Sequence, residues 1–206
     1  MLLVWKLAHQ KGRFDKSRLL IAGVIAGMFF SAGISLIMYL YQKDTALILG
    51  TLMGNLGHIF TSSEWVFFLI LLVVSFAILI YLYFKSTAID ILSGGDLYAA
   101  SLGINVLALR RQIFILTSIV IGISVSYAGI IGFVGLIISH IVRYFVPSGQ
   151  KKIYLLSLLS GGIFLLACDL VAKQLLAIEL PVGIITAFIG CPFFMWLLLK
   201  KPSSKL

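Results

Sequence analysis

Several ionisable side chains stand inside long apolar stretches and could do chemistry. His140 and Arg143 are three residues apart in "GFVGLIISHIVRYFVP", which suits either an acid–base pair or the end of a membrane helix. Asp169 and Lys173 are four residues apart in another apolar run, and Glu179 follows them. Ionisable groups in such surroundings are costly and need a partner or a function. An intramembrane enzyme that uses His140, Asp169 or Glu179 is therefore one hypothesis.

The sequence lacks the common patterns of nucleotide-binding, metalloprotease, calcium-binding and serine-hydrolase sites, such as GxxxxGK[ST], HExxH, the EF-hand loop and Gly-x-Ser-x-Gly. Cys168 and Cys191 lie in apolar runs without a CxxC pair, so we interpret both as free thiols. His9, His58 and His140 fall in separate parts of the predicted topology, which argues against a shared metal site. We expect this chain to bind no cofactor or metal itself.

Composition indicates an integral membrane protein. Of the 206 residues, 61% are hydrophobic and 11% are charged, whereas soluble domains have about 45–50% apolar and about 25% charged residues. The net charge of +9 would suggest nucleic acid as the partner of a soluble protein. Here the basic residues cluster between apolar runs, so we interpret them as signals of membrane topology and expect a lipid bilayer and no nucleic acid.

Six segments are apolar enough for transmembrane helices, which need about 20 residues to cross a hydrocarbon core of about 30 Å. They are residues 19–40, 65–84, 112–130, 132–146, 153–172 and 182–199. The fourth is short, so we expect it to be tilted, broken or partly enclosed by protein. The predicted fold class is all-α, a polytopic helical membrane protein.

The distribution of basic residues predicts the orientation. With the N-terminus in the cytoplasm, fourteen of the sixteen Lys and Arg residues lie on the cytoplasmic side, and only Lys43 and Lys173 lie outside. The positive-inside rule favours this arrangement, with both termini cytoplasmic, in a plasma membrane. Arg143 then lies at the cytoplasmic end of its helix. The enzyme hypothesis loses support, because His140 is near the inner side whereas Asp169 and Glu179 are near the outer side.

Small residues form a stripe on the first predicted helix. Gly23, Gly27 and Ser31 follow one another at four-residue spacing, and Ser35 extends the same face. Small residues on one face let helices approach closely, so a packed bundle explains the stripe. The alternative is that the stripe lines a translocation path, and both can hold for one helix. Asp169 and Lys173 leave a similar choice, between a structural i,i+4 ion pair and a functional one.

Two segments between the predicted spans are informative. The external segment 42–64 contains "LGTLMGNLG" and predicts a short helix near the membrane surface. The cytoplasmic segment 86–105, "STAIDILSGGDLYAASLGIN", is too polar to span and too apolar for an idle loop. It predicts two small helices that are separated at Gly94 and Gly95, with Asp96 capping the second. The apolar side chains would then form an exposed patch that suits a partner.

Three motifs resemble the FecCD-type permeases, the membrane subunits of ABC importers for iron–siderophores, haem and vitamin B12. They are "AGIIGFVGLIISHIVRYFV", "ELPVGIITAFIGCPFFMWLLLKK" and "LSGGDLYAASLGIN", in the order and spacing of that family. The resemblance runs from about Arg13 onward and covers the last six or so helices of a ten-helix fold, in a single permease domain over residues 1–206. It implies a second permease subunit, two cytoplasmic ATPases that carry ATP and Mg, and an extracytoplasmic substrate-binding protein.

The resemblance also implies roles for individual residues. The cytoplasmic gate corresponds to Lys16 and Ser17, the pore lining to the stripe on the first helix, and the contact with the binding protein to Lys173. The positions that couple to the ATPase are Gly94, Gly95, Asp96, Ala99, Leu102 and Gly103. The implied substrate is an iron–siderophore, with haem or cobalamin as the alternatives.

The sequence departs from the family pattern in two ways. Ser139 precedes His140 where the family commonly has proline, so the inner half of that helix is expected to be straighter. The chain also begins near the end of the family's fourth helix, which leaves a fragment, a split gene or a truncated gene as explanations. The alternative to a working permease is therefore a truncated membrane fragment that does not transport.

Overall fold

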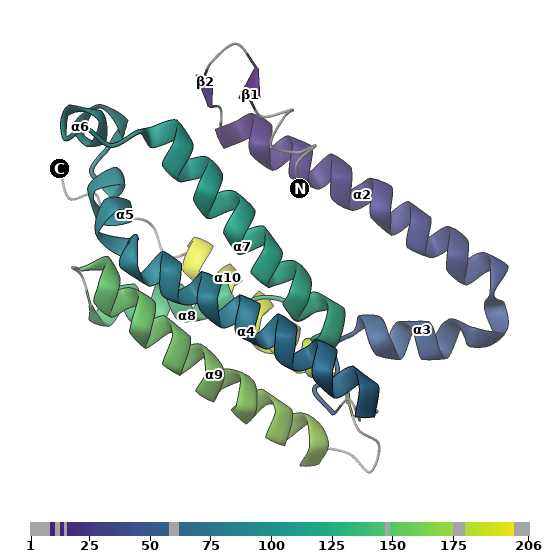
Figure 1. Ribbon diagram of the computed structural model, residues 1–206. Helices are drawn as coiled ribbons and strands as arrows, with labels where there is room; N and C mark the ends of the chain where they lie inside the picture. The colour runs from purple at the N-terminus through teal and green to yellow at the C-terminus, as the bar shows by residue number, and fades with distance from the viewer. Residues whose placement is uncertain are drawn as a thin grey trace.

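A computed structural model describes residues 9–10, 13–14, 16–57, 62–146, 149–174 and 180–199 (Figure 1). The elements are β1 (His9–Gln10), β2 (Arg13–Phe14), α2 (Lys16–Leu40), the 3-10 helix η1 (Gln42–Asp44), α3 (Thr45–Leu52), α4 (Ser62–Phe84), α5 (Ser86–Ser93), α6 (Asp96–Ser101), α7 (Val106–Ala128), α8 (Val134–Phe145), α9 (Gln150–Gln174) and α10 (Val182–Leu199). The predicted all-α class is confirmed. The one addition among these elements is the two-residue antiparallel pair β1–β2.

Four of the described helices are long and apolar enough to cross a membrane: α2, α4, α7 and α9. Two further apolar helices, α8 and α10, are shorter. The 12 residues of α8 extend about 18 Å at 1.5 Å per residue, which is well short of a hydrocarbon core of about 30 Å. The predicted span 132–146 is thus a helix that does not cross a bilayer by its own length.

The helices from α4 to α10 pack together, whereas α2 lies apart. In Figure 1, α9 lies beside α8, and α4 beside α7, while α2 is connected to this group through η1 and α3. Small clusters of buried side chains lie along α9. One joins Ile138 and Val142 of α8 to Ile153 near the start of α9, and the other joins Cys168 and Ala172 to Val182 of α10. The core is therefore distributed along one helix.

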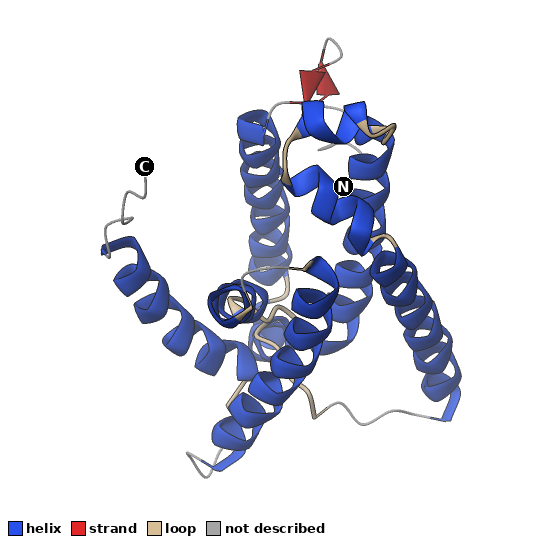
Figure 2. Ribbon diagram, turned by 90° about the vertical axis from the view of Figure 1, so that its left-hand side faces the viewer, coloured by secondary structure: helices blue, strands red, loops and turns tan. Residues whose placement is uncertain are grey.

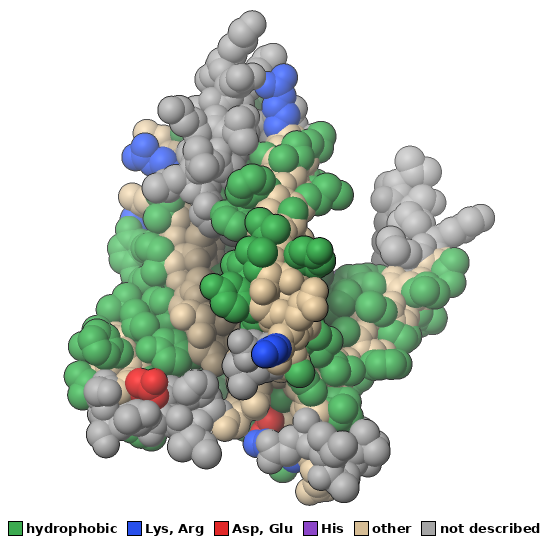
Figure 3. Space-filling model, turned by 90° about the vertical axis from the view of Figure 1, so that its right-hand side faces the viewer, with side chains coloured by type: hydrophobic (Ala, Val, Ile, Leu, Met, Phe, Trp, Pro, Cys, Tyr) green, Lys and Arg blue, Asp and Glu red, His purple; other side chains and the backbone are tan. Residues whose placement is uncertain are grey.

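Apolar side chains cover the outside of the molecule. Phe29, Ile163 and Phe188 are each more than two-thirds exposed, and Figure 3 shows hydrophobic side chains over much of one face. An apolar surface of this extent is incompatible with water, and it is what lipid or further helices would cover. The structure therefore supports the membrane class that the composition predicts.

The two ends of the molecule differ in their local structure. At one end, which also carries the β1–β2 pair, the short helices α5 and α6 connect α4 to α7 (Figures 1 and 2). We call residues 86–105 the elbow. At the other end, the turn after α3 meets the connection from α7 to α8 and the start of α10. We call Gly54, Gly129 and Gly183, with the backbone that they contact, the glycine junction.

Candidate functional site

The elbow bends at two glycines that have positive φ angles. α5 ends at Ser93, and α6 begins at Asp96. Gly95, between them, has φ 119° and ψ 156°, a region that is essentially restricted to glycine. Gly103, which ends the segment after α6, has φ 79°, in the left-handed range that glycine adopts without steric cost. The sequence therefore determines both bends through residues that lack a Cβ atom.

Ala99 holds α6 against the rest of the elbow. Its side chain is completely buried, its N–H donates to the Gly95 carbonyl at 3.0 Å, and its carbonyl accepts from the Ile104 N–H at 3.1 Å. Asn105 then caps α7, because its Oδ1 accepts from the Ala108 N–H at 3.1 Å. These contacts fix the path of the chain from α6 into α7.

An ion pair connects α6 to α7. Arg110 donates from both terminal nitrogens to the two carboxylate oxygens of Asp96, at 3.0 and 2.6 Å. The prediction that Asp96 caps α6 is wrong: the N-cap position is Gly95, and Asp96 is the first helical residue. The bidentate, charge-assisted pair is the stronger use of the carboxylate, and its place in the first turn still favours the helix dipole.

Arg110, which lies on α7 and contacts the elbow, is a residue that the sequence analysis missed. We counted it only as a topology charge, although it lies in the second turn of α7 and its side chain is 19% exposed. The available signal was an Asp and an Arg of opposite charge on either side of a glycine-bounded turn. Sequence spacing alone does not show that the two ends of such a turn come back together.

The elbow presents an exposed apolar face. Leu97 is 90% exposed, and Tyr98 and Leu102 are each more than half exposed. They lie on or next to α6, whose opposite side holds the buried Ala99. A short helix that exposes large apolar side chains outside the long membrane helices is suited to dock on another protein.

The elbow is also fastened to α4 and α9. Ser86, at the start of α5, is 2% exposed and donates to the Tyr83 carbonyl at 2.6 Å. α5 packs against α9, and beside this contact the Tyr154 hydroxyl on α9 donates to the Leu79 carbonyl on α4 at 2.9 Å. A displacement of the elbow would therefore act on α4, α7 and α9 together.

Backbone hydrogen bonds form the glycine junction at the other end. The Asn55 N–H donates to the Ala128 carbonyl at 3.0 Å, the Ile130 N–H to the Leu52 carbonyl at 3.0 Å, and the Val182 N–H to the Gly54 carbonyl at 2.9 Å. Three segments that are far apart in the sequence are thus joined here by main-chain hydrogen bonds.

Close approach explains why glycines occupy the junction. A Cβ on Gly129 would lie 2.5 Å from the Thr51 carbonyl oxygen and 2.8 Å from the Gly54 Cα. A Cβ on Gly183 would overlap the Met53 carbonyl oxygen. The sequence analysis noted glycines in the external segment 42–64 but did not predict this junction, because its three parts come from distant segments.

Phe133, between α7 and α8, adopts a strained conformation. It caps α8 with φ 65°, which is unusual for an aromatic residue, and its side chain fills the space that a side chain on Gly190 of α10 would take. Its ring lies 6.0 Å from that of Phe194. Packing against α10 therefore holds the turn that replaces the first residues of the predicted fourth span.

The ion pair expected between Asp169 and Lys173 is confirmed. Lys173 Nζ lies 2.8 Å from Asp169 Oδ2, and the two side chains are 41% and 15% exposed, respectively. Lys173 is in the last turn of α9, where a cation favours the helix dipole. Part of the lysine surface stays accessible in the described chain.

The other predicted residues lie on α2 or outside the described part of the chain. Ser31 and Ser35 are exposed, and among the described residues no atom outside the helix lies within 4 Å of a Cβ built at Gly23 or Gly27. Lys16 and Ser17 are the first residues of α2, and their side chains lie outside the description. The stripe is therefore uncovered in this structure.

The groups of the enzyme hypothesis do not converge in the described residues. His140 is exposed on α8, and its ring is 6.2 Å from that of Phe193. His140 lies between Ile138 and Val142, which pack on Ile153 near the start of α9. Asp169 is about 24 Å further along α9 by helix rise. Glu179 lies outside the described residues. Within the described ranges, no three His, Cys, Asp or Glu side chains gather at a potential metal site.

Comparisons with known proteins agree on one family. The profile of the FecCD transport family matches residues 1–200. The vitamin B12 import system permease protein BtuC of Salmonella typhi is 36% identical over 197 residues, which are 95% of this chain and 59% of that protein. BtuC of Salmonella agona is 35% identical over the same shares. This chain thus spans about three-fifths of the curated relatives that it matches.

A solved structure extends the likeness to three dimensions. It is an ABC transporter described as metal-chelate type, in an inward-facing conformation. The superposition has a TM-score of 0.79 at 30% sequence identity, and it covers 97% of this chain and 63% of that one. The arrangement of the helices here is therefore similar to that of a transporter permease over nearly the whole chain.

Proposed function

The chain belongs to the FecCD transport family, and on that premise we propose that it forms part of the membrane-spanning permease of an ABC importer. The observation that carries the proposal is the elbow, which holds an exposed apolar face on α6 and is fastened to three membrane helices. ATP hydrolysis, with its Mg, takes place on two cytoplasmic ATPase subunits. Movement of the elbow shifts the permease between inward-open and outward-open states.

The remaining partners follow from the same proposal. A second permease subunit, identical or similar, covers the uncovered face of α2 and completes the path. Gly23, Gly27, Ser31 and Ser35 line that path, and the cytoplasmic gate is at Lys16 and Ser17. An extracytoplasmic binding protein delivers the substrate. Lys173 offers it a positive charge, although a lysine cannot form the bidentate contact of an arginine.

The proposed location is the bacterial plasma membrane, with both termini in the cytoplasm. Support comes from the four long apolar helices and from the fourteen basic residues that this orientation places inside. Fusion of a reporter that is active only in the cytoplasm to the C-terminus tests the orientation. A reporter that is active only outside would be silent there and active when inserted after Lys43.

The proposed substrate is a metal chelate. An iron–siderophore is the first candidate, in keeping with the metal-chelate type of the similar solved transporter. A corrinoid is the second, because the curated relatives at 35–36% identity are vitamin B12 permeases. Uptake of radiolabelled iron–siderophore and of radiolabelled cobalamin, measured in cells that carry the complete transporter, separates the two.

Co-purification tests the central proposal. The 206-residue chain and a version extended upstream to the nearest in-frame start are expressed with the ATPase encoded beside them. The ATPase is then captured from detergent. We expect capture by one or both versions and its loss in Leu97→Asp. Thr87→Asp is the matched control, because Thr87 is exposed on α5 but is not part of the apolar face.

Each outcome of this capture has a definite meaning. Capture by both versions that depends on Leu97 supports a docking role for the elbow in the short chain itself. Capture by the extended version alone supports the alternative of a truncated fragment that does not transport by itself. Capture by neither version, with both folded, would overturn the coupling role of the elbow.

A further inference from the structure

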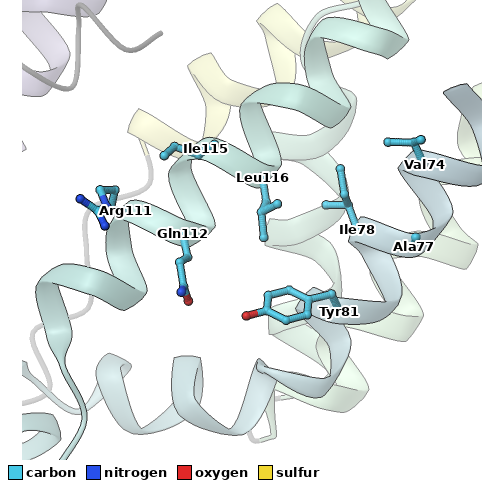
Figure 4. A pocket seen from close by; sticks show the side chains of 8 residues that line it. All are labelled: Val74, Ala77, Ile78, Tyr81, Arg111, Gln112, Ile115 and Leu116. Atoms are coloured by element: carbon cyan, nitrogen blue, oxygen red, sulfur yellow. The ribbon is translucent and has the colours of Figure 1, made fainter.

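An open groove runs between α4 and α7, outside the residues to which a role has been given. Its volume is about 600 Å³, within the range of about 300–1,000 Å³ that is typical of small-molecule sites. The lining side chains are Val74, Ala77, Ile78 and Tyr81 from α4, and Arg111, Gln112, Ile115 and Leu116 from α7 (Figure 4). The groove thus lies between two helices that are long enough to cross the membrane.

The two ends of the groove differ in chemistry. Tyr81, Arg111 and Gln112 lie at the end nearer the elbow, and the Gln112 amide and the Tyr81 hydroxyl face the same space (Figure 4). Lys85 adds a second cation there, with its Nζ 5.8 Å from the centre of the Tyr81 ring. None of the eight described lining residues is acidic. This end is therefore positively charged and rich in hydrogen-bond donors.

The rest of the groove is apolar and follows the helices into the membrane. Val74 is ten residues before the end of α4, and Leu116 is ten residues after the start of α7. Ten residues of helix correspond to about 15 Å, which is half the thickness of a hydrocarbon core of about 30 Å. The groove reaches from the polar end of the helices to the depth at which the acyl chains of one leaflet end.

We propose that this groove binds an anionic phospholipid, with its headgroup at the end that holds Tyr81, Arg111 and Gln112 and an acyl chain along the apolar wall. Charge complementarity argues for an anionic headgroup, because basic pockets between membrane helices on the cytoplasmic side select acidic lipids. The length and apolar lining argue for a lipid rather than a soluble phosphate. The inference goes beyond transport, and it rests on the proposed orientation, which places this end of α4 and α7 at the cytoplasmic surface.

Native mass spectrometry of the purified chain in detergent tests the site. Phosphatidylglycerol and phosphatidylcholine with the same acyl chains are added, and the number of bound lipids is counted. Each basic side chain near a membrane surface favours an acidic lipid by about fivefold. We expect a clear preference for phosphatidylglycerol, which Arg111→Gln reduces by about fivefold. Equal binding of both lipids to the wild-type chain would overturn the proposal.

Matched variants distinguish binding in the groove from non-specific attraction to basic residues and from the effect of a large side chain elsewhere on α4. Arg143→Gln removes an exposed arginine of α8 that does not line the groove, so the lipid preference is expected to persist. Ala77→Trp fills the apolar part and is expected to lower the occupancy of both lipids, whereas Ile80→Trp, on another face of α4, leaves it unchanged. Equal effects of Arg111→Gln and Arg143→Gln would show only non-specific attraction.

Two further measurements by native mass spectrometry would identify other occupants of the groove. If millimolar glycerol phosphate displaces the bound lipid completely, the site is for a soluble phosphate ester and the proposal is wrong. If Ala77→Trp changes the ratio of monomer to dimer and leaves the lipid count unchanged, a second copy of the chain covers the groove. Either result leaves the capture of the ATPase unaffected, so failure here is distinct from failure of the transport proposal.

Discussion

The elbow and the glycine junction both join distant segments, but they do so by different physical means. At the elbow, α6 is joined to α7 by the charged side chains of Asp96 and Arg110. At the junction, backbone contacts backbone at Gly54, Gly129 and Gly183, with hydrogen bonds of 2.9–3.0 Å. The elbow contact is made by flexible side chains at the edge of water, whereas the junction contact is made by main chain.

This difference predicts how each end tolerates change. An ion pair that is open to water on one side, as at Asp96, contributes about 0–1 kcal/mol, and its partners can separate and meet again as helices shift. Backbone segments in direct contact leave no flexible group to absorb a displacement, and interiors at native packing density respond to a single added methylene. We therefore expect the junction to act as a rigid connection and the elbow as an adjustable one.

The largest effect is expected for Gly183→Ala. The new Cβ would overlap the Met53 carbonyl oxygen, and neither the helix α10 nor the turn after α3 can give way without breaking the Val182–Gly54 hydrogen bond. We expect a loss of more than about 3 kcal/mol, at the upper end for overpacked sites. Thermal unfolding in detergent, followed by size-exclusion fluorescence, measures it.

Gly162→Ala is the control for that substitution. No described atom outside α9 lies within 4 Å of its Cβ position, and alanine favours a helix over glycine by about 1 kcal/mol. Its melting temperature should match or exceed that of the wild-type chain. A Gly183→Ala chain as stable as the wild type would show that the junction can open at little cost, contrary to the comparison.

The next effect is the difference between Gly129→Ala and Gly103→Ala. Both glycines have positive φ, 71° and 79°, so both substitutions carry the left-handed cost of about 1–2 kcal/mol. Only Gly129 also faces backbone atoms within 3 Å, which adds about 1–3 kcal/mol. Chemical unfolding in mixed micelles compares the two. Equal losses would mean that conformation alone, and not close approach, selects glycine at the junction.

A smaller effect on stability is expected when the elbow ion pair is broken. Asp96→Asn and Arg110→Gln should each lower the free energy of unfolding by up to about 1 kcal/mol, and a double-mutant cycle should give a coupling energy of similar size. The amount of ATPase captured should fall clearly even though the chain remains folded, because α6 loses its fixed position. If the exchanged pair, Asp96→Arg with Arg110→Asp, restores nothing, the charge pairing is not what positions α6.

The smallest effect on stability is expected for Lys173→Gln. The pair with Asp169 is an i,i+4 contact with a part-exposed lysine, and such pairs contribute about 0.3–0.5 kcal/mol. The affinity for the extracytoplasmic binding protein is measured by surface plasmon resonance. The loss of affinity caused by Lys173→Gln should be larger at low salt than at high salt. Lys43→Gln is the control of equal charge on the same proposed side. Equal loss in both variants would remove the specific role of Lys173.

Several features could be read from the sequence because their causes are local. The predicted break at Gly94 and Gly95 does separate α5 from α6, with the special backbone conformation at Gly95. The Asp169–Lys173 pair follows from helical spacing. The sequence showed that the fourth span is short. It did not show that a turn at Phe133 replaces the first residues of that span. That turn depends on Gly190 of α10, which lies 57 positions further along the chain.

The sequence by itself determined the membrane class, the helical elements, the bend between α5 and α6 and the family, since composition, apolar length and short motifs are properties of neighbouring residues. The tertiary structure alone decided that Asp96 meets Arg110 instead of capping α6, that three glycines meet at one junction, and that α4 and α7 leave a groove with a basic end. The reason is that each of these depends on distances between segments that the chain brings together only when its helices pack.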